Sequence, residues 1–560
     1  MSHPLVFCLW ILCTSFLTLG FWSVVSIVQN VRLARTTGLP FVVLPFSLLG
    51  APWPLAQSIV FWHNGYEPFE RLKTETFLAV SPGGLILYTC DPDVNSRLYR
   101  KVTGPFFSEN TMCRVFVHSV SGAKILLAAL VRPGAYRQLR AMSARLCLHT
   151  LTRMAFSFQT DVDLTQALAF QDDIPDGKTL SFSQALHGFV DSLVTVFIAP
   201  HWLLRLSPFR SHRRAVACYS ELGSYMNQLK RTREDEFSEK SVPGYSSHED
   251  LLDLLVQAGT SSQAKESPRL SNAQIIGQIF LFMFAGHEAN ANILVSIVLL
   301  LACHPEVQKA LQRDLDSILG DTSPDTWSYD EHYSALMHST VGAIINETLR
   351  LFTVIPVLPK HVPPEGRWLS ITVKDQCHPL PPNTIALINT SATHRHPEYW
   401  LNKPATKKAD KRSSWRDIRS DPRQRPYAVV DFDPSRWLDP GSTDETGAQA
   451  NSANFLKPRA GTFIPFSEGS RGCLGRRFAL VEVCAVVATL FKTHSVELVA
   501  DTRNGSVGEE EAWLEARQCA ALTLSEGTKF GTSLRVVDVV PIRFVPRKPQ
   551  SSCRVAEEHV

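Results

Sequence analysis

Cys473 lies in the segment FSEGSRGCLG (466–475), where three glycines surround a single cysteine. Backbone N–H groups can approach a sulfur closely only where side chains are absent, and Gly469, Gly472 and Gly475 supply that freedom. A thiolate that binds a metal must be deprotonated and protected from water and oxidants. Because no second cysteine stands at CxxC spacing, the pattern predicts a single metal-binding thiolate and neither a zinc knuckle nor a thioredoxin-like pair.

The residues around Cys473 indicate which metal group it would bind. The segment RRFALVEVCAVVATLFKT (476–493) predicts a helix, so the cysteine would lie near a helix N-terminus, where an anionic sulfur is favoured. Phe466 can shield the ligand, and Arg471 predicts an acidic partner such as a haem propionate. A lone thiolate fits haem better than zinc, because the porphyrin supplies four nitrogen ligands. The alternative, a structural cysteine in a glycine-rich turn, would need neither of these side chains.

FSEGSRGCLG matches the FxxGxRxCxG signature of the cytochrome P450 family at every fixed position. The chain therefore resembles that family, in its membrane-anchored, fungal microsomal type, roughly over residues 30–545. The resemblance implies haem b as the cofactor and Cys473 as the axial ligand of its iron. It also implies a group of haem-contacting residues: Phe466, Gly469, Arg471 and Gly475.

Three further segments resemble the family in the right order. ETLR, with Glu347 and Arg350, resembles the family's ExxR pair, and a spacing of three places both side chains on one helical face. FDPSRW resembles a later family segment, whose Arg436 is implied to join that pair in a buried network. PVLPKHV resembles the strand beside the haem, with Lys360 where an arginine often meets a propionate.

The segment AGHEAN (285–290) resembles the family's oxygen-binding segment, written A/G-G-x-D/E-T-T. Ala285 and Gly286 remove bulk, so that oxygen can bind next to the helix and the helix can bulge locally. Glu288 preserves the acid that passes protons to the bound oxygen. These residues are the expected oxygen side of the active site.

The alcohol that normally follows this acid is missing, because Ala289 stands in its place. We expect Asn290, with an ordered water, to supply the missing proton-delivery group, so that monooxygenation is retained. A hydroxyl group on the substrate could also do so. The alternative is a haem-thiolate isomerase or radical-coupling enzyme that inserts no oxygen.

A second departure from the family lies upstream. The family carries a Trp-x-x-x-Arg helix that holds a haem propionate, but no tryptophan stands between Trp62 and Trp202. Tyr136 and Arg140 form a weak substitute, and residues 105–150 do not resemble the family. A lineage-specific insertion and an incorrect gene model both remain open. This departure suggests a further alternative, a degenerate, non-catalytic haem or membrane protein.

The elements that must position these residues are mostly helices. A long apolar helix is predicted over 271–304, and we expect it to cross the protein core rather than a membrane. A bilayer would penalise the polar residues in its middle, which are His287, Glu288, Asn290 and Asn292. The segments 304–320 and 333–352 show helical periodicity, and 369–373 and 384–390 predict strands. The fold class is thus mainly α with small β-sheets (α+β), and the resemblance implies the cytochrome P450 fold with its long central helix over the haem. Two charged segments, 230–249 and 402–426, are expected to be exposed loops.

The N-terminal segment 4–31 carries no charged residue and is long enough to cross a bilayer. Arg32 and Arg35 follow it, so the positive-inside rule places the rest of the chain in the cytosol. A cleaved signal peptide or a buried helix is the alternative. We expect one catalytic domain behind an anchor, with these parts: a transmembrane anchor at 1–35, a proline-rich stalk at 36–60, a haem-thiolate domain at 61–545 and a polar tail at 546–560.

Composition excludes some partners and favours others. A net charge of +3 over 560 residues implies no nucleic-acid partner, and twelve scattered cysteines suit a reducing compartment. Family and anchor together imply the endoplasmic reticulum membrane, with a single span, and electrons from NADPH through NADPH-cytochrome P450 reductase. Arg476 and Arg477 are candidates for docking that reductase, and the apolar segment 179–230 indicates a lipophilic small-molecule substrate. A role in secondary metabolism is expected from the general use of such anchored enzymes.

Overall fold

The computed structural model describes a defined part of the chain: residues 24–32, 34–36, 38, 40–43, 74, 76–81, 84–89, 108–157, 164–168, 174–198, 201–239, 250–260, 272–362, 368–373, 376–382, 384–400, 432–439, 454–469, 472–499, 508–530 and 533–547. The chain divides into two compact units. Unit 1 comprises 1–106, 346–425 and 455–474, and unit 2 comprises 107–345, 426–454 and 475–560. Each unit is described by itself.

Unit 1 is built on a mixed five-stranded sheet in the order β1-β2-β3-β7-β4. Its strands are β1 (Phe41–Val43), β2 (Thr76–Ser81), β3 (Gly84–Thr89), β4 (Val357–His361) and β7 (Ile385–Asn389). The central pair β3–β7 is parallel, whereas β2–β3 and β4–β7 are antiparallel. A separate hairpin pairs β5 (Leu369–Val373) with β6 (Gln376–Leu380), and its inward side chains join those of the sheet in one apolar core. The predicted strands at 369–373 and 384–390 are confirmed.

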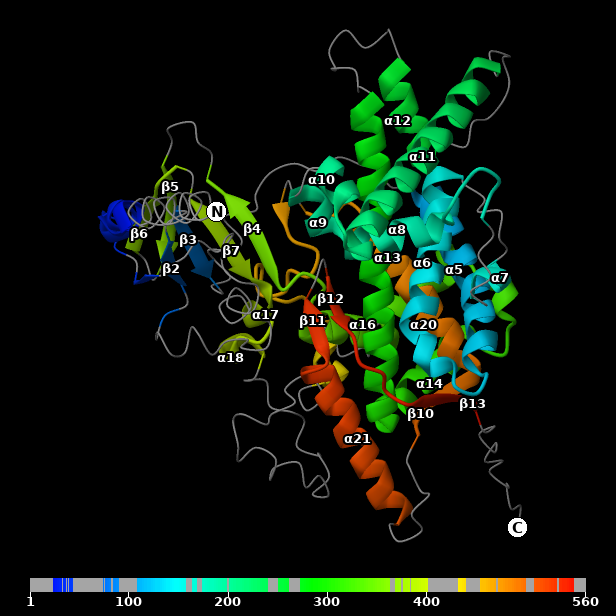
Figure 1. Ribbon diagram of the computed structural model, residues 1–560. Helices are drawn as coiled ribbons and strands as arrows, with labels where there is room; N and C mark the ends of the chain where they lie inside the picture. The colour runs from blue at the N-terminus through cyan, green and yellow to red at the C-terminus, as the bar shows by residue number, and fades with distance from the viewer. Residues whose placement is uncertain are drawn as a thin grey trace, which may run out of the picture. The chain divides into compact units, whose positions relative to one another are not determined.

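Unit 2 is mainly helical, and its helices pack around one another in Figure 1. Its longer helices are α5 (Glu109–Leu130), α6 (Leu139–Phe156), α8 (Phe182–Asp191), α11 (Arg210–Glu239), α12 (Leu251–Thr260), α13 (Asn272–Cys303), α14 (Pro305–Leu319), α20 (Arg476–Thr493) and α21 (Glu509–Ser525). The shorter helical segments are η1 (Ala135–Gln138), α7 (Leu164–Leu168), α9 (Leu193–Ile198), α10 (His201–Leu206), η2 (Pro324–Thr326), η3 (Tyr329–Tyr333), α15 (Ser334–Met337) and η5 (Pro434–Trp437). Two hairpins complete it: β10 (His494–Leu498) with β13 (Ile542–Pro546), and β11 (Thr528–Phe530) with β12 (Leu534–Val536).

Shorter elements lie in unit 1 or at the division between the units. α16 (Thr340–Leu351) begins in unit 2 and ends in unit 1. α17 (Thr390–Thr393) and α18 (Pro397–Trp400) follow β7 in unit 1. β8 (Leu438–Asp439) pairs with β9 (Asn454–Phe455).

Helix α13 passes through the core of unit 2, as its sequence predicts. It packs along α6 and α20, and every described side chain from Asn290 to Cys303 is buried. A helix that is apolar on all sides is stable only when other elements cover all of its faces. By length and composition, two described helices could cross a membrane, Glu109–Leu130 and Ile275–Cys303, but 56% and 78% of their most apolar stretches lie buried inside the protein. The prediction of a core helix at 271–304 is therefore confirmed.

The segment 105–150, for which the sequence left an insertion and an incorrect gene model open, forms regular structure from residue 108 onward. Ser108 caps α5 by accepting a hydrogen bond from the backbone N–H of Thr111, and α5 packs along α20. The 3-10 helix η1 and helix α6 follow, and α6 lies along α13 (Figure 1). The segment is thus an integral part of the core of unit 2.

Two predictions about secondary structure are wrong. The charged segment 230–249 is helical as far as Glu239, because oppositely charged side chains on one face, such as Lys230 and Glu234 at 2.7 Å, favour a helix. The periodic segment 333–352 is not one helix but α15 and α16. The break occurs where Asp314 accepts hydrogen bonds from the N–H and hydroxyl of Thr340.

Several predictions fall on residues outside the described part. These are most of the anchor at 1–35, of which 24–32, 34 and 35 are helical, most of the stalk at 36–60, the basic segment 402–426, the tail from 548 onward, and Arg471. The predicted domain boundaries therefore stay predictions.

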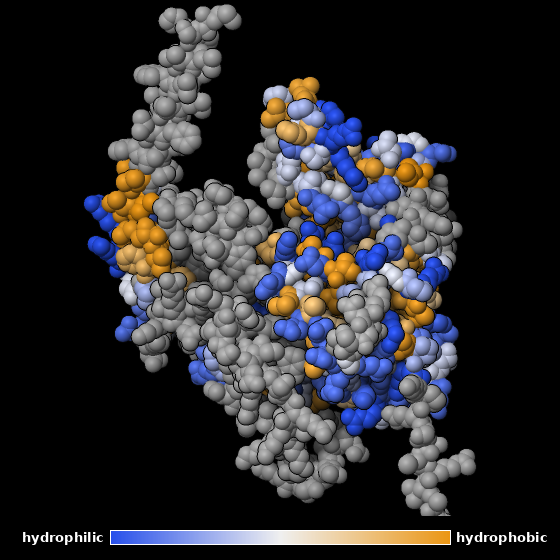
Figure 2. Space-filling view, turned by 60° about the horizontal axis from the view of Figure 1, so that its bottom comes forward, coloured by the Kyte–Doolittle hydropathy of each residue, from blue (hydrophilic) through white to orange (hydrophobic). Residues whose placement is uncertain are grey.

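On the surface, Figure 2 shows one continuous hydrophobic patch and, elsewhere, small hydrophobic islands among hydrophilic side chains.

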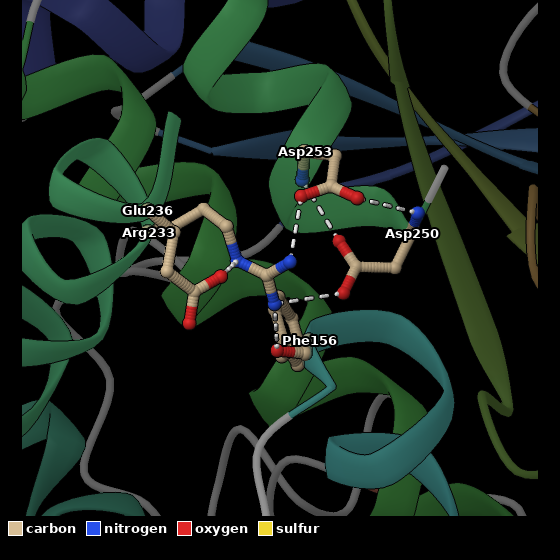
Figure 3. A network of polar contacts seen from close by, with 5 residues as sticks. All are labelled: Phe156, Arg233, Glu236, Asp250 and Asp253. Atoms are coloured by element: carbon tan, nitrogen blue, oxygen red, sulfur yellow. Dashed lines mark hydrogen bonds and ion pairs between the residues drawn. The ribbon is translucent and has the colours of Figure 1, made fainter. Parts of the chain in front are cut away.

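A buried charge network ties three helices of unit 2 together (Figure 3). Arg233 of α11 donates to Asp253 at 2.8 Å, to Asp250 at 3.1 Å and to the carbonyl oxygen of Phe156 at 3.1 Å. Both aspartates are buried and also cap the start of α12, since each accepts a hydrogen bond from the other's backbone N–H. Burial and the neighbouring Asp250 raise the pKa of Asp253, against the effect of Arg233. Arg233 therefore compensates two carboxylates that would be costly to bury alone.

We predict that Arg233→Met destabilises unit 2 by about 3 kcal/mol, because it leaves Asp250 and Asp253 without their cation. Urea unfolding, followed by hydrogen exchange of the α12 amides, measures this loss. Arg231→Met, an exposed arginine of the same helix, is the matched control and should leave stability unchanged. The loss should shrink as the pH falls, because protonation removes the buried negative charges. Equal stability of the two variants at neutral pH would contradict the role of Arg233.

Candidate active site

Cys473 ends a tight backbone loop in unit 1. The N–H of Cys473 donates to the carbonyl oxygen of Phe466 at 2.8 Å, and the N–H of Gly472 donates to that of Gly469 at 2.9 Å. These two N–H groups close the loop rather than point at the sulfur, which differs from the expectation for Gly472. Cys473 itself is exposed.

The loop requires unusual backbone conformations. Gly469 has φ = 75° and Ser467 has φ = 59°, in the left-handed region that residues with side chains rarely adopt. A Cβ atom on Gly472 would lie 3.2 Å from the carbonyl oxygen of Gly469, so a side chain there would crowd the turn. The loop therefore holds one cysteine in a fixed backbone frame, which fits a single-thiolate ligand, whereas the exposure of that cysteine differs from the expected protection from water. Among the described residues, no group of three or more His, Cys, Asp or Glu side chains could hold a metal ion instead.

A buried ion pair supports this loop from behind. Arg350 donates from Nε and Nη2 to the two carboxylate oxygens of Glu347 at 2.9 and 2.8 Å, and both side chains are almost fully buried. A third donor, Nη1, binds the carbonyl oxygen of His394 at 3.0 Å. The Nε2 atom of His394 in turn accepts the N–H of Ile464 at 2.8 Å. Burial lowers the pKa of His394 to about 3, so its imidazole is neutral and free to accept.

Ile464 stands at the start of the Cys473 loop, because its carbonyl oxygen accepts the N–H of Ser467 at 3.0 Å. The chain of hydrogen bonds from Glu347 through Arg350 and His394 thus reaches the loop that carries the cysteine. Sequence analysis found the pair but not the histidine. The sequence around His394 offered no sign that this side chain would accept a backbone hydrogen bond.

The remaining predicted haem-side residues are placed as follows. Lys360 lies half-buried in β4 of unit 1, and Arg436 lies half-buried in η5 of unit 2. Gly475 is the N-cap of α20, and it has no side chain that could accept a hydrogen bond from the first N–H groups of that helix. The predicted roles of these residues stay predictions.

Of the two arginines predicted to dock a reductase, Arg477 has partners within unit 2. Its guanidinium pairs with Glu109 at the start of α5 and donates to the hydroxyl of Tyr329 at 2.7 Å. The hydrogen bond from Arg477 lowers the pKa of Glu109. Arg476 is the exposed member of the two.

The middle of α13 carries the predicted oxygen-side residues. Ala285 is exposed, but a Cβ atom on Gly286 would lie 2.8 Å from Cδ2 of Leu151 in α6. Gly286 therefore permits the close packing of two helices, a role that its place in the motif did not reveal. The helix runs as unbroken α-helix through this point, so the expected local bulge is absent from α13.

Glu288 faces a cluster of charges contributed by other elements. Its Oε1 lies 3.5 Å from Nη1 of Arg535 in β12, and the same nitrogen lies 3.5 Å from Oδ1 of Asp191 at the end of α8. Arg140, the expected substitute for the family's propionate-binding arginine, belongs to this cluster. Burial and the nearby Arg535 lower the pKa of Arg140, whereas Glu288 and Asp191 act in the opposite direction.

Asn290 points into the helix bundle. Its Nδ2 donates to Oε2 of Glu482, a fully buried carboxyl group of α20. Burial raises the pKa of Glu482 to about 8, although Asn290, Thr150 and Cys147 all donate hydrogen bonds that oppose the rise. Glu482 is thus predominantly protonated at neutral pH, and the amide of Asn290 is engaged with it. The predicted role of Asn290 in proton delivery stays a prediction.

His287, between Gly286 and Glu288, is a structural residue. Its Nδ1 donates to the carbonyl oxygen of Met283 at 2.7 Å, and its ring meets that of His187 edge-on at 5.5 Å. Burial lowers the pKa of His287 to about 4, so the imidazole is neutral. At physiological pH it therefore lacks the acidic second proton of an imidazolium, and its one N–H proton is held by the carbonyl oxygen of Met283.

Sequence analysis missed Asp191, Glu482 and Arg535. Each is an ordinary charged residue far from α13 in the sequence. Glu482 and Arg535 contact residues of α13, and Asp191 contacts Arg535. A local pattern holds no information about such contacts. Only the glutamate nine residues after Cys473, in an otherwise apolar helix, gave a signal that could have been followed.

Comparisons with known proteins assign this fold and loop to a class. Over 91% of its length the chain matches a crystal structure titled as the haem domain of cytochrome P450DA, covering 99% of it, with a TM-score of 0.57 and 17% identity. This likeness shows the fold: mainly helical, with small sheets, as found in haem domains. The predicted fold class is therefore confirmed.

The family follows from the sequence comparisons. The family model of cytochrome P450 matches residues 137–406 and 430–514. A cytochrome P450 monooxygenase of Arthrobotrys oligospora is 26% identical over 85% of this chain and 84% of its own, and one of Penicillium roqueforti is 25% identical over 87% and 90%. A taurochenodeoxycholic 6 alpha-hydroxylase of Sus scrofa is 28% identical over 61% of this chain and 55% of its own. The chain belongs to the cytochrome P450 family, and with it to the oxidoreductases of the monooxygenase class.

We predict that Glu482→Gln makes the protein relatively more stable as the pH rises. With a folded pKa of about 8 and an ordinary unfolded value, the parent carboxyl binds a proton only in the folded state over the intervening range, so its stabilising contribution falls from about pH 5 to about pH 8. Glutamine keeps the shape and cannot titrate. The free energy of unfolding of both proteins, measured from pH 5 to 9, should rise in the variant relative to the parent. This difference should become constant above about pH 8. Parallel curves would contradict a proton on Glu482.

Proposed function

We propose that this protein is a haem-thiolate monooxygenase that inserts one oxygen atom of O2 into a lipophilic small molecule. The observation that carries the proposal is the exposed Cys473 at the end of a closed, glycine-dependent loop that a buried ion pair supports. Family membership supplies the chemistry: haem b activates oxygen, and the thiolate's electron donation favours O–O cleavage. The named monooxygenase relatives do not favour the isomerase, radical-coupling or non-catalytic alternatives.

Cys473 would ligate the iron, with Phe466, Gly469 and Gly475 around the haem. Lys360 and Arg471 would bind propionates. Glu347, Arg350 and Arg436 would have structural roles.

On the oxygen side, Ala285 leaves room beside α13, and Glu288 would hand protons to the reacting oxygen. Since Ala289 has no hydroxyl group, Glu288 is the proton donor within the motif itself. Asn290 would act behind it, through its hydrogen bond to the protonated Glu482.

We further propose that electrons come from NADPH through NADPH-cytochrome P450 reductase, and that the enzyme serves secondary metabolism. Likeness to fungal and mammalian cytochrome P450 proteins supports the first proposal, and likeness to fungal monooxygenases over most of the chain supports the second. The exposed Arg476 would take part in docking the reductase. Carbon-monoxide difference spectra and NADPH-dependent oxygen uptake tied to product test this function.

The proposed location is the endoplasmic reticulum membrane, with a single N-terminal span and the catalytic domain in the cytosol. A surface of unit 2 supports membrane contact. Arg205 lies among, and Arg210 directly after, four large hydrophobic side chains in and after α10. These four are strongly exposed: Trp202 at 64%, Leu203 at 50%, Leu206 at 77% and Phe209 at 63%. Exposed aromatic and aliphatic groups beside arginines suit the interface of an anionic bilayer.

We predict that Cys473→Ser abolishes the carbon-monoxide difference spectrum of a thiolate-bound haem, because serine offers no thiolate. The spectrum of the reduced protein measures this directly. Cys519→Ser, an exposed cysteine of α21, is the matched control and should keep the parent spectrum. An unchanged spectrum in Cys473→Ser would remove Cys473 as the ligand.

We predict that replacing Trp202, Leu206 and Phe209 by serine weakens membrane binding of the chain that lacks residues 1–35 by about tenfold or more, because each buried apolar side chain contributes about 1.5–3 kcal/mol. Co-sedimentation with phosphatidylcholine vesicles containing phosphatidylserine measures this binding. Val537→Ser with Val539→Ser, exposed at 46% and 53% in the same unit, serves as the control. Equal binding by the parent, triple variant and control would rule out this surface.

A further inference from the structure

One nitrogen atom links the predicted proton donor to the protein surface. Nη1 of Arg535 lies 3.5 Å from Oε1 of Glu288 and 3.5 Å from Oδ1 of Asp191. Three separate elements of unit 2 supply these groups, namely α13, α8 and β12. The guanidinium is therefore shared between two carboxylates.

The two carboxylates differ greatly in their access to water. The side chain of Glu288 is 12% exposed, that of Arg535 is 28% exposed, and that of Asp191 is 67% exposed. The three groups thus form a graded path from solvent to the middle of α13. A second cation, Arg140, balances the charge of the cluster from the start of α6.

The geometry leaves the arginine free to change partner. At 3.5 Å both contacts are ion pairs at the outer limit of hydrogen-bond length, so neither carboxylate holds the guanidinium in a close bidentate bond. The two distances are equal, but water screens the pair with the exposed Asp191 more than the pair with Glu288, so the charged Glu288 attracts the guanidinium more strongly. A small rotation of the side chain would strengthen one contact and release the other.

We propose that Arg535 is a positioning residue for proton transfer: it orients Glu288 while the carboxylate is charged, and it moves toward Asp191 when Glu288 takes up a proton from solvent. This inference rests on the proposed monooxygenase function. That reaction consumes O2, two electrons from the reductase and two protons, and it yields the hydroxylated product and one water. Glu288 would accept a proton from water and pass it to the reacting oxygen, after which its charge draws Arg535 back.

The absent alcohol makes such a partner necessary. Ala289 offers no hydroxyl group that could orient the neighbouring carboxylate. A charged and nearly buried glutamate also needs a cation close by, because burying it alone would cost several kcal/mol. Arg535 meets both needs from outside the motif.

The test uses the holoenzyme with four single variants and a matched control. Arg535→Met removes the charge, Arg535→Lys keeps it, Asp191→Asn removes the surface partner, and Glu288→Gln removes the proton donor. The control is Arg543→Met on β13, whose partner Glu497 forms an exposed ion pair at 2.8 Å. Each protein is first checked for a thiolate-haem spectrum and for NADPH-dependent product, so that failure of the proposed function is seen in the parent and kept apart from failure of this inference.

We expect Arg535→Met to lower kcat about tenfold or more, with more peroxide released per NADPH and an increased solvent deuterium isotope effect, while the substrate KM stays unchanged. Asp191→Asn should lower kcat less, Arg535→Lys should recover most of it, and Arg543→Met should match the parent. In Glu288→Gln, the further change Arg535→Met should cost nothing more.

A measurement independent of turnover accompanies these. Thermal unfolding of the parent, Arg535→Met, Glu288→Gln and the double variant should show a combined loss smaller than the sum of the two single losses, because the same ion pair is removed in each. Additive losses would overturn the pairing. A raised KM with unchanged kcat would make Arg535 a substrate-binding residue, and unchanged coupling and isotope effect would make it purely structural; either result overturns the proposal.

Discussion

The buried ion pair between Glu347 and Arg350 is the interaction on which the cysteine loop depends. Two parallel hydrogen bonds satisfy the carboxylate, and the third goes to the carbonyl oxygen of His394. A buried pair of this kind contributes little net stability, but removing one partner leaves an uncompensated charge in the interior. Its geometry is therefore held firmly. Through His394 and Ile464 that rigidity passes to the loop, so the sulfur is positioned by a network in which Cys473 takes no part.

In unit 2 a buried carboxyl group is neutralised by a proton and not by a cation. No cation among the described residues pairs with the buried Glu482, so burial raises the pKa of its carboxyl group and keeps it mostly neutral. Asn290 can then serve as its hydrogen-bond donor without introducing charge between α13 and α20. The apolar surroundings of α13 accommodate polar groups only when these groups are neutral and hydrogen-bonded to each other. Paired ions support the cysteine loop, and a protonated acid lies within the helix bundle.

Local features of the fold were predictable from the sequence, and contacts over long distances were not. The helix 476–493, the core helix 271–304 and the spacing of Glu347 and Arg350 follow from periodicity, which depends only on neighbouring residues. The helix at 230–239 was missed because its charges suggested a loop, whereas Asp250 and Asp253 hold Arg233 in place. Gly286 illustrates this limit of sequence analysis most clearly. Its motif suggested a role in oxygen binding, whereas in the structure it lets α13 pack closely against Leu151 of α6.

The charge cluster at Glu288 shows how a motif can lose a member and keep its chemistry. The family's acid is followed by an alcohol, and a chain with Ala289 must obtain orientation for that acid from elsewhere. Arg535 and Arg140 bring two positive charges to the two negative charges of Glu288 and Asp191, so the cluster is neutral as a whole. Because these charges lie close together, the energy of each group depends on its neighbours in the cluster. Protonation of Glu288 therefore weakens its attraction for Arg535, so that Arg535 can move toward Asp191. This response needs no hydroxyl group.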